Sequence, residues 1–456
     1  MLIVWASIWG RRLERREPRI KLGAAPFVGK WDFRFTPAFI PAVVFAAAVV
    51  WGLPRILRSV SDVWAVVIAA ASAAIFAFVL AAADGFSAVL APVVDPTEYL
   101  ANLEFLPNAS DVLLLHSNYE FLVDRTVHMK GHPPGFILIL KGLAAIGLGA
   151  PWVVGALSFL GVALLVSAVG VVVRVVTDGA QTRLVLPFLV MAPFAVWLGT
   201  SADAFFSGIA AWGIATAILG VRSNRLGRRF LLGFGSGLLL SGALFLTYGA
   251  ATLLVLVAVT MLAGKRSRAA ATLQVGAWAC LSALLMTGVF YQLGFWWYDG
   301  LKLTNKFYWV GSAFFRTWTY FLLGNVAVLL IAVGPAVVAG VASLRDRRLW
   351  PLVGGALLCI TIAEISQYSK GEVERIWLLF MPWLVPAVVS LAKPSPAMES
   401  LTGRSNTAGL SERTIPTERT VPTERTVPTE RTIPTWWLGV QAILALIIQG
   451  ALRSKW

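Results

Sequence analysis

Long apolar runs recur along most of this sequence, and they constrain its fold more than any other feature. A helix needs roughly 17–25 largely apolar residues to cross a bilayer. Only helices and closed barrels satisfy their backbone hydrogen bonds there, and these runs do not alternate as barrel strands do. The sequence therefore predicts an all-α, polytopic bundle of about 11–13 transmembrane helices. The apolar runs lie at 37–53, 63–83, 152–173, 184–198, 205–220, 230–246, 250–263, 269–293, 318–341, 352–363, 376–391 and 436–452.

Basic residues gather in short clusters between these runs. The chain carries 38 Lys and Arg against 23 Asp and Glu, a net charge of +15. The clusters at 174–183, 222–229, 265–268 and 345–348 follow the positive-inside rule for cytoplasmic loops, which argues against a nucleic-acid partner. The remaining loops, 84–135, 291–317 and 364–375, then lie on the extracytoplasmic face. We expect a multi-pass protein of the cell membrane.

Four segments follow from this pattern. Residues 1–36 are expected to form a basic N-terminal tail attracted to anionic lipid, and residues 37–391 a transmembrane domain. A spanning helix at 37–53 would leave the basic tail outside, so that helix is either re-entrant or an exception to the charge rule. Residues 392–435 form a linker, and 436–456 contain a last transmembrane helix. In the linker the hexad Glu-Arg-Thr-Ile/Val-Pro-Thr occurs four times from 412 to 435, and its prolines predict an extended spacer.

The longest polar interruption is the loop 84–135, which holds all three histidines of the chain. Asp95 and Glu98 lie near its start, where a carboxylate beside an apolar wall suits a general base or a metal ligand. Alternatively, Asp95 caps a short helix that starts at Pro96. The sequence His132-Pro-Pro-Gly predicts a rigid elbow that opens a half-helix over 134–148, too short to cross the membrane. A divalent metal stays possible, although no thiol accompanies the histidines.

Two later outer segments contain groups suited to an anionic ligand. Arginine in particular has a planar fork that matches a phosphate. Interfacial anchoring and local ion pairs are the alternatives for the same residues. The candidate binding residues are Lys370, Glu372, Glu374 and Arg375 in one segment, and Tyr298 and Arg316 in the other.

Over roughly residues 60–390, these motifs resemble the GT-C superfamily of polyprenyl-phosphate-sugar-dependent glycosyltransferases. Asp95 stands four residues before Tyr99, as the family aspartate does, whereas the family glutamate is displaced to Glu98. His132-Pro133-Pro134 matches the second family motif, and Ser201-Ala202-Asp203-Ala204 a third recurrent feature. The segment 371–377 resembles that of actinobacterial members.

The resemblance implies an inverting transfer of a sugar, such as mannose or another hexose or pentose, from a polyprenyl-phosphate donor. The acceptor would be a cell-envelope glycan, lipid or protein on the outer face. Asp95, or Glu98 in second place, would take the acceptor proton. Arg375 and Lys370 would hold the leaving phosphate, and His132 would position the sugar or the acceptor. The rival interpretation is a flippase or transporter that binds lipid-linked sugars without cleaving them. Such proteins often carry internal repeats, and the two halves of this chain show none.

Overall fold

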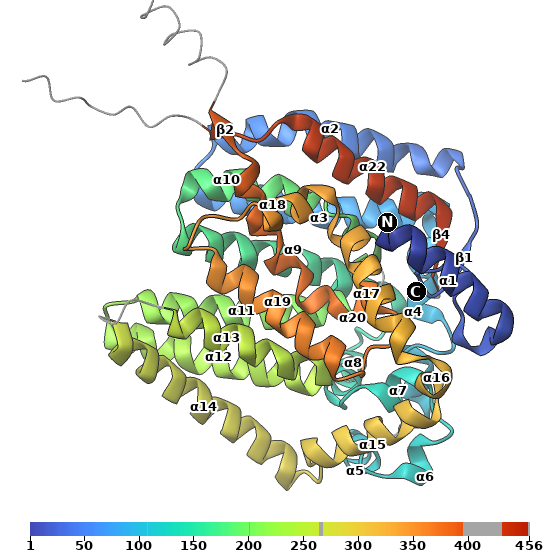
Figure 1. The fold of residues 1–456 in the computed structure, drawn as a ribbon. Coiled ribbons are helices and arrows are strands. Elements are labelled where there is room, and N and C mark those ends of the chain that lie inside the picture. The colour runs from blue at the N-terminus through green and yellow to red at the C-terminus, as the bar shows by residue number, and fades with distance from the viewer. Residues whose placement is uncertain (107, 200, 264–267, 395–430, 455–456) are drawn as a thin grey trace, which may run out of the picture.

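Helices make up almost the whole structure, a computed structural model that describes residues 1–106, 108–199, 201–263, 268–394 and 431–454 (Figure 1). The longer helices are α1 (Leu2–Arg16), α2 (Ile40–Ser59), α3 (Asp62–Ala81), α8 (Gly135–Ala145), α9 (Pro151–Val176), α10 (Gly179–Val190), α11 (Ala202–Arg222), α12 (Leu226–Leu246), α13 (Leu253–Leu262), α14 (Ala269–Gln292), α15 (Trp297–Val310), α17 (Trp318–Val333), α18 (Pro335–Ala342), α19 (Trp350–Ile365) and α22 (Thr435–Ala451). The short ones are α4 (Ala91–Val94), α5 (Ala109–Leu115), α6 (Tyr119–Leu122), α7 (Val127–Gly131), α16 (Ser312–Phe315) and α20 (Val373–Ile376).

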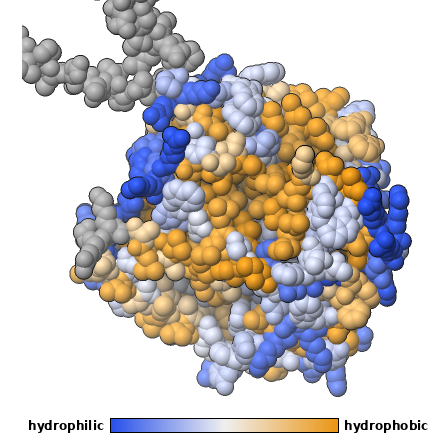
Figure 2. All heavy atoms as spheres, in the orientation of Figure 1, coloured by the Kyte–Doolittle hydropathy of each residue, from blue (hydrophilic) through white to orange (hydrophobic). Residues whose placement is uncertain are grey.

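Within the described residues, six helices are long and apolar enough to cross a membrane, or up to eight if each of two bent pairs forms one span. The structure therefore confirms an all-α fold with transmembrane-type helices. The six are Pro37–Ser59, Asp62–Asp84, Pro151–Val176, Ala202–Arg222, Leu226–Leu246 and Ala269–Gln292. Figure 2 shows hydrophobic surface across the middle of the molecule, between hydrophilic regions at its two sides.

Several of the predicted spans are broken or short, so the count lies below the expected 11–13. The run at 318–341 bends by 105° where α17 meets α18, because Gly334 takes a positive φ and Pro335 starts a new helix. The run at 184–198 ends as a helix at Val190, and a 3-10 turn at Pro193–Trp197 follows. The run at 376–391 bends by 62°, and prolines in it again remove backbone donors. Helix α8 is short, as predicted for the half-helix.

Small residues let the central helices approach one another closely. A side chain at Gly161 of α9 would meet the backbone of Ala204 and Phe205 at the start of α11. One at Gly237 of α12 would meet the carbonyl of Ala279 in α14. Close backbone approach at small residues is typical of helix packing in membranes, where lipid is as apolar as leucine. These contacts bring α9 close to α11 and α12 close to α14.

The polar loops predicted to lie on one face do gather at one end of the bundle, which we call the loop end. Arg453, after α22, contacts Asp84 at 2.8 Å. The Thr304 hydroxyl of α15 donates to the Lys130 carbonyl at 2.9 Å, and the Tyr308 hydroxyl donates to the Gln367 carbonyl at 2.8 Å. The Thr304 bond joins the loop 84–135 to the segment 291–317, and the Tyr308 bond joins that segment in turn to 364–375.

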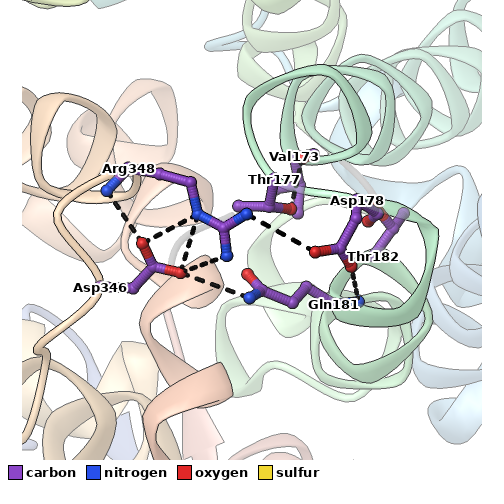
Figure 3. A network of polar contacts seen from close by, with 7 residues as sticks. All are labelled: Val173, Thr177, Asp178, Gln181, Thr182, Asp346 and Arg348. Carbon is purple, nitrogen blue, oxygen red and sulfur yellow. Dashed lines mark hydrogen bonds and ion pairs between the residues drawn. The ribbon is translucent and has the colours of Figure 1, made fainter. Parts of the chain in front are cut away.

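Three basic clusters within the described residues, at 174–183, 222–229 and 345–348, occupy the opposite end, which we call the basic end. Arg183 donates to the carbonyls of Leu57 and Val60, each at 2.8 Å. Figure 3 shows how this end is tied together: Arg348 pairs with Asp346 at 2.8 Å and with Asp178 at 3.6 Å. These ion pairs and hydrogen bonds hold the basic loops at the end of the bundle opposite the polar loops.

Residues 1–36, expected to form a tail, are instead folded against the bundle. Ala6 and Gly10 of α1 are buried against α17, where the Tyr320 hydroxyl donates to the Ala6 carbonyl at 3.0 Å. Strand β1 (Lys30–Trp31) pairs with β4 (Leu452–Arg453) in an antiparallel register. Helix α2 runs without a break, and the Thr36 hydroxyl donates to the Ala83 carbonyl at 3.3 Å. The basic N-terminal segment thus lies at the loop end.

The linker predicted at 392–435 lies mostly outside the described residues. Its two ends are held side by side, because β2 (Lys393–Pro394) pairs with β3 (Arg431–Thr432). A chain that joins two adjacent strands needs little length. Deleting 418–429, which are two whole hexads, should leave the membrane level and the thermal stability of the protein near wild type. Quantitative blotting and Tm would check this, and a large loss of folded protein would show that the repeats pack on the bundle.

Candidate functional site

A partly buried polar cluster lies at the loop end, where the loop 84–135 meets the start of α11 and the segment around α20. Four separate parts of the chain supply its members, and each is bounded by apolar helices that bring it to this end. We call it the polar cluster and define it as Glu98, Tyr99, His128, His132, Asp203 and Arg375.

Glu98 and the histidines form one side of the polar cluster. His128 Nε2 lies 2.9 Å from Glu98 Oε1, and the His128 side chain is only 4% exposed. The rings of His128 and His132 stack with centroids 5.9 Å apart. Tyr99 packs beside both rings, with centroids 5.2 Å from His128 and 5.9 Å from His132. His132 itself contacts the Leu246 carbonyl through Nδ1 at 3.3 Å, so the end of α12 fixes the orientation of its ring.

An ion pair forms the other side of the polar cluster. Ser201 caps α11, accepting from the Asp203 backbone N–H at 3.1 Å and donating to Asp203 Oδ2 at 2.8 Å. The same carboxylate oxygen lies 3.2 Å from Arg375 Nε, and the two side chains are 16% and 10% exposed. Asp203 of α11 thus pairs with Arg375 across the fold, and the nearby Glu372 carboxylate also favours the charge of this guanidinium group.

Electrostatics links the two sides. Burial raises the pKa of Tyr99 far above its usual range, the Asp203 and Glu98 carboxylates raise it further, and Arg375 opposes them. Burial lowers the pKa of His132 to about 4, although Asp203 favours the charged ring. At neutral pH the Tyr99 phenol and the His132 imidazole are therefore both uncharged, and each can donate or accept a hydrogen bond.

The buried histidines predict a pH dependence of stability. Burial also lowers the pKa of His116 to about 4, below the value of about 6.5 for an unfolded chain. The unfolded state then binds more protons, so the stabilising contribution of neutral His116 and His132 is lost as pH falls from about 6.5 towards 4. We expect Tm of the purified protein to fall between pH 7 and 5. The fall should be smaller in His116→Asn, and an unchanged slope in that variant would contradict this origin.

A second polar group surrounds the loop 366–372, next to the polar cluster. Arg316 donates to the Lys370 carbonyl at 2.7 Å and contacts Glu372 Oε1 at 3.0 Å. Asn325 of α17 donates to the Ser369 carbonyl at 2.6 Å and accepts from the Gly371 N–H at 3.1 Å. Asn325 thereby fixes a loop whose backbone passes through positive φ at Gly371 and Glu372.

Lys370 has a different environment from the two arginines. Its Nζ lies 4.5 Å from the centre of the Trp309 ring, and burial lowers the pKa of its ammonium group. Among the described residues no carboxylate pairs with it, whereas Arg316 and Arg375 each pair with one. Lys370 is therefore the cation of this region best suited to receive an added anion.

The other predicted site residues lie in distinct places. Asp95 Oδ1 accepts from the Thr97 N–H at 2.7 Å and from the Thr97 hydroxyl at 2.6 Å. These bonds close a turn and not the helix from Pro96 that the capping alternative expected, since the next helical segment is a 3-10 helix at Leu100–Phe105. Glu374 is fully buried, and among the described residues neither of its carboxylate oxygens has a hydrogen-bond partner. Tyr298 is 51% exposed and contacts Lys302. The structure does not bring Tyr298 to the polar cluster.

From the sequence, Tyr99 and Asp203 stand out as parts of the family motifs and His128 as one of the three histidines of the loop 84–135, but none of them is predicted as a site residue, and nor is Asn325. The serine cap at Ser201 is a local signal that Asp203 begins a helix, but its pairing with Arg375 depends on the fold. His128 precedes His132 by four residues, a spacing that indicates proximity. Asn325 lies within an apolar helix, where a buried amide is a signal in itself because polar groups there need partners.

No metal cluster is evident in the part of the chain that the structure describes: no three His, Cys, Asp or Glu side chains lie together in a way that suits a metal ion. No protein-family model and no curated protein matches this chain.

Proposed function

We propose that this protein is an integral-membrane glycosyltransferase that moves a sugar from a polyprenyl-phosphate donor to a cell-envelope acceptor on the outer face. The observation that carries the proposal is the polar cluster at the loop end together with Lys370 beside it. Carboxylates, the neutral His132 imidazole and the Lys370 ammonium group, which no carboxylate among the described residues pairs with, lie at the same end of an apolar helix bundle. A donor whose tail lies in the bilayer and whose reacting carbon lies at its surface fits this arrangement.

The acidic turn supplies the base. Asp95 and Glu98 belong to one turn, in which the Glu98 N–H donates to the Asp95 carbonyl at 2.9 Å. Both bonds from Thr97 go to Asp95 Oδ1 and hold that oxygen in the turn, whereas Glu98 contacts His128. We assign the base to Asp95 and the positioning of His128 to Glu98. This agrees with the order of the motif in the family that the sequence resembles.

The reaction follows from these roles. Asp95 takes the proton of the acceptor hydroxyl while its oxygen attacks the anomeric carbon from the face opposite the phosphate. The bond from that carbon to the phosphate oxygen breaks, and the phosphate leaves with the electron pair. Negative charge therefore grows on the phosphate, and Lys370 stabilises it there. The neutral His132 and Tyr99 supply hydrogen bonds to sugar or acceptor hydroxyls.

The proposal fixes which end of the bundle faces outward. Single cysteines at Asn108 and Gly311, in a chain with Cys280→Ser, should react with an impermeant thiol reagent added to intact cells. A cysteine at Ser223 should react only after lysis. The reason is that Asn108 and Gly311 belong to the loop end and Ser223 to the basic end, which the positive-inside rule keeps in the cytoplasm. Labelling of Asn108 only after lysis would reverse the orientation.

The test of function separates transfer from transport. Proteoliposomes would contain a polyprenyl-phosphate sugar labelled in the sugar, together with envelope lipids as acceptors. A glycosyltransferase moves the label to a new product with inverted anomeric configuration, which NMR identifies. A flippase moves intact donor across the bilayer, and this outcome would overturn the proposal.

A further inference from the structure

A shallow, open groove of about 390 Å³ lies along one side of helix α1, outside the polar cluster. Trp5, Ile8, Trp9 and Arg12 line it. Ile8 is 43% exposed, and Ile3 and Val4 beside it are also exposed. The first turns of α1 thus present apolar side chains to the surroundings, and Arg12 lies at the C-terminal end of the groove.

The aromatic side chains indicate the depth of this groove relative to the bilayer. Trp5 and Trp9 meet edge to face with centroids 4.5 Å apart, and both pack on Tyr320, at 6.3 and 5.8 Å. Tyr320 belongs to the first turn of α17, at the loop end of the bundle. Trp and Tyr prefer the boundary between hydrocarbon and headgroups. The groove therefore lies at the level where a lipid headgroup meets its chains.

The charge around the groove is positive and is not neutralised locally. Arg11, Arg12, Arg15 and Arg16 all belong to the C-terminal half of α1. The two acidic residues nearby are engaged elsewhere: Glu14 accepts from the Leu22 N–H at 2.5 Å, and Glu17 pairs with Arg19 at 2.6 Å. Among the described residues, no carboxylate lies within ion-pair distance of Arg12. Figure 2 shows hydrophilic side chains at the edge of the molecule where α1 ends.

We propose that this groove is a binding site for an anionic phospholipid of the bilayer. One acyl chain lies against Trp5, Ile8 and Trp9, and the phosphodiester contacts Arg12. The site is distinct from the proposed sugar-transfer site and does not depend on it. It also gives a reason for the folded N-terminal segment, because a helix with an apolar first half and a basic second half binds best at an interface that offers both environments.

The experiment uses the purified full-length protein, delipidated in a neutral detergent and titrated with phosphatidylglycerol, with native mass spectrometry counting bound lipids. Arg12→Gln should lower the apparent affinity about fivefold, the effect of one interfacial arginine on an anionic lipid. Ile8→Ser should lower it as well, through lost apolar contact. The matched controls are Arg11→Gln and Val4→Ser, on the same helix but outside the groove, and they should stay within about twofold of wild type.

Two titrations complete the design. Phosphatidylcholine should bind more weakly than phosphatidylglycerol, because its choline cation offsets the charge of the phosphodiester, and Arg12→Gln should lower its affinity less than that of phosphatidylglycerol. Inorganic phosphate should not displace the lipid. Equal losses in Arg11→Gln and Arg12→Gln would show diffuse attraction to a basic surface and would overturn the site. Displacement by inorganic phosphate would show a simple anion site without a chain, which also contradicts the proposal.

Discussion

Replacing Asp95 with asparagine should lower sugar transfer by roughly 10²–10⁴-fold, the usual contribution of a general base. The substitution keeps the shape of the side chain and its turn with Thr97, but it removes the basicity that accepts the hydroxyl proton. Donor binding should change little, because Asp95 acts on the acceptor. The measurement is initial rate against donor concentration in proteoliposomes, with donor affinity measured separately.

Glu98→Gln is the informative companion to this variant. Glu98 contacts His128 at 2.9 Å, so its loss should disturb the polar cluster and lower activity less than the loss of the base. A folded Asp95→Asn protein that keeps most of its activity, beside an inactive Glu98→Gln protein, would reverse the two roles. It would also show that the alignment through Tyr99 is wrong.

Arg375→Gln should destabilise the folded protein by about 3–5 kcal/mol, because it leaves the Asp203 carboxylate largely buried without its cation. Thermal or denaturant unfolding of the purified protein measures this. The matched control is Arg348→Gln at the basic end, which breaks a pair whose arginine is 47% exposed. An exposed pair of that kind contributes roughly 0–1 kcal/mol.

The second variant in this series tests the cause of the loss. Arg375→Gln combined with Asp203→Asn removes both charges and should recover a large part of the lost stability. The sequence by itself favoured Arg375 as a phosphate ligand. If Arg375→Gln is as stable as wild type but binds the donor weakly, the phosphate role holds and the Asp203 pair is incidental.

The bundle was predictable from sequence because apolar run length reports directly on the solvent around a helix. The sorting of loops by charge was predictable for a similar reason, since the positive-inside rule depends only on the Lys and Arg residues within each short loop. Bends were not. Gly334-Pro335 permits a kink, but its 105° angle depends on what α17 and α18 pack against. The folded state of residues 1–36 was missed because its partners, Tyr320 and the strand β4, lie at the far end of the sequence.

Some residues of the candidate site were likewise predictable from the local sequence, and others were not. Residues in contiguous motifs, such as Glu98 and His132, were found because the motif itself carries the signal. The pairing of Arg375 with Asp203 was not predicted. Glu372 and Glu374 are close to Arg375 in the sequence, whereas Asp203 comes near it only in the folded chain. Tyr298 was selected for its aromatic and basic neighbours, but that composition equally describes an interfacial anchor, and in the structure Tyr298 is half exposed on α15 beside Lys302.

The release of free polyprenyl phosphate is the sharpest test of whether this protein cleaves the donor and transfers its sugar. Purified protein would be incubated in proteoliposomes with a polyprenyl-phosphate sugar labelled in the lipid and with envelope acceptors. Sugar transfer with Asp95 as the base requires that wild type produces free polyprenyl phosphate in step with glycosylated acceptor. The Asp95→Asn protein, folded and with donor bound, should produce neither at an appreciable rate. Intact donor after prolonged incubation with the wild-type protein, and above all its movement to the opposite leaflet, would contradict it.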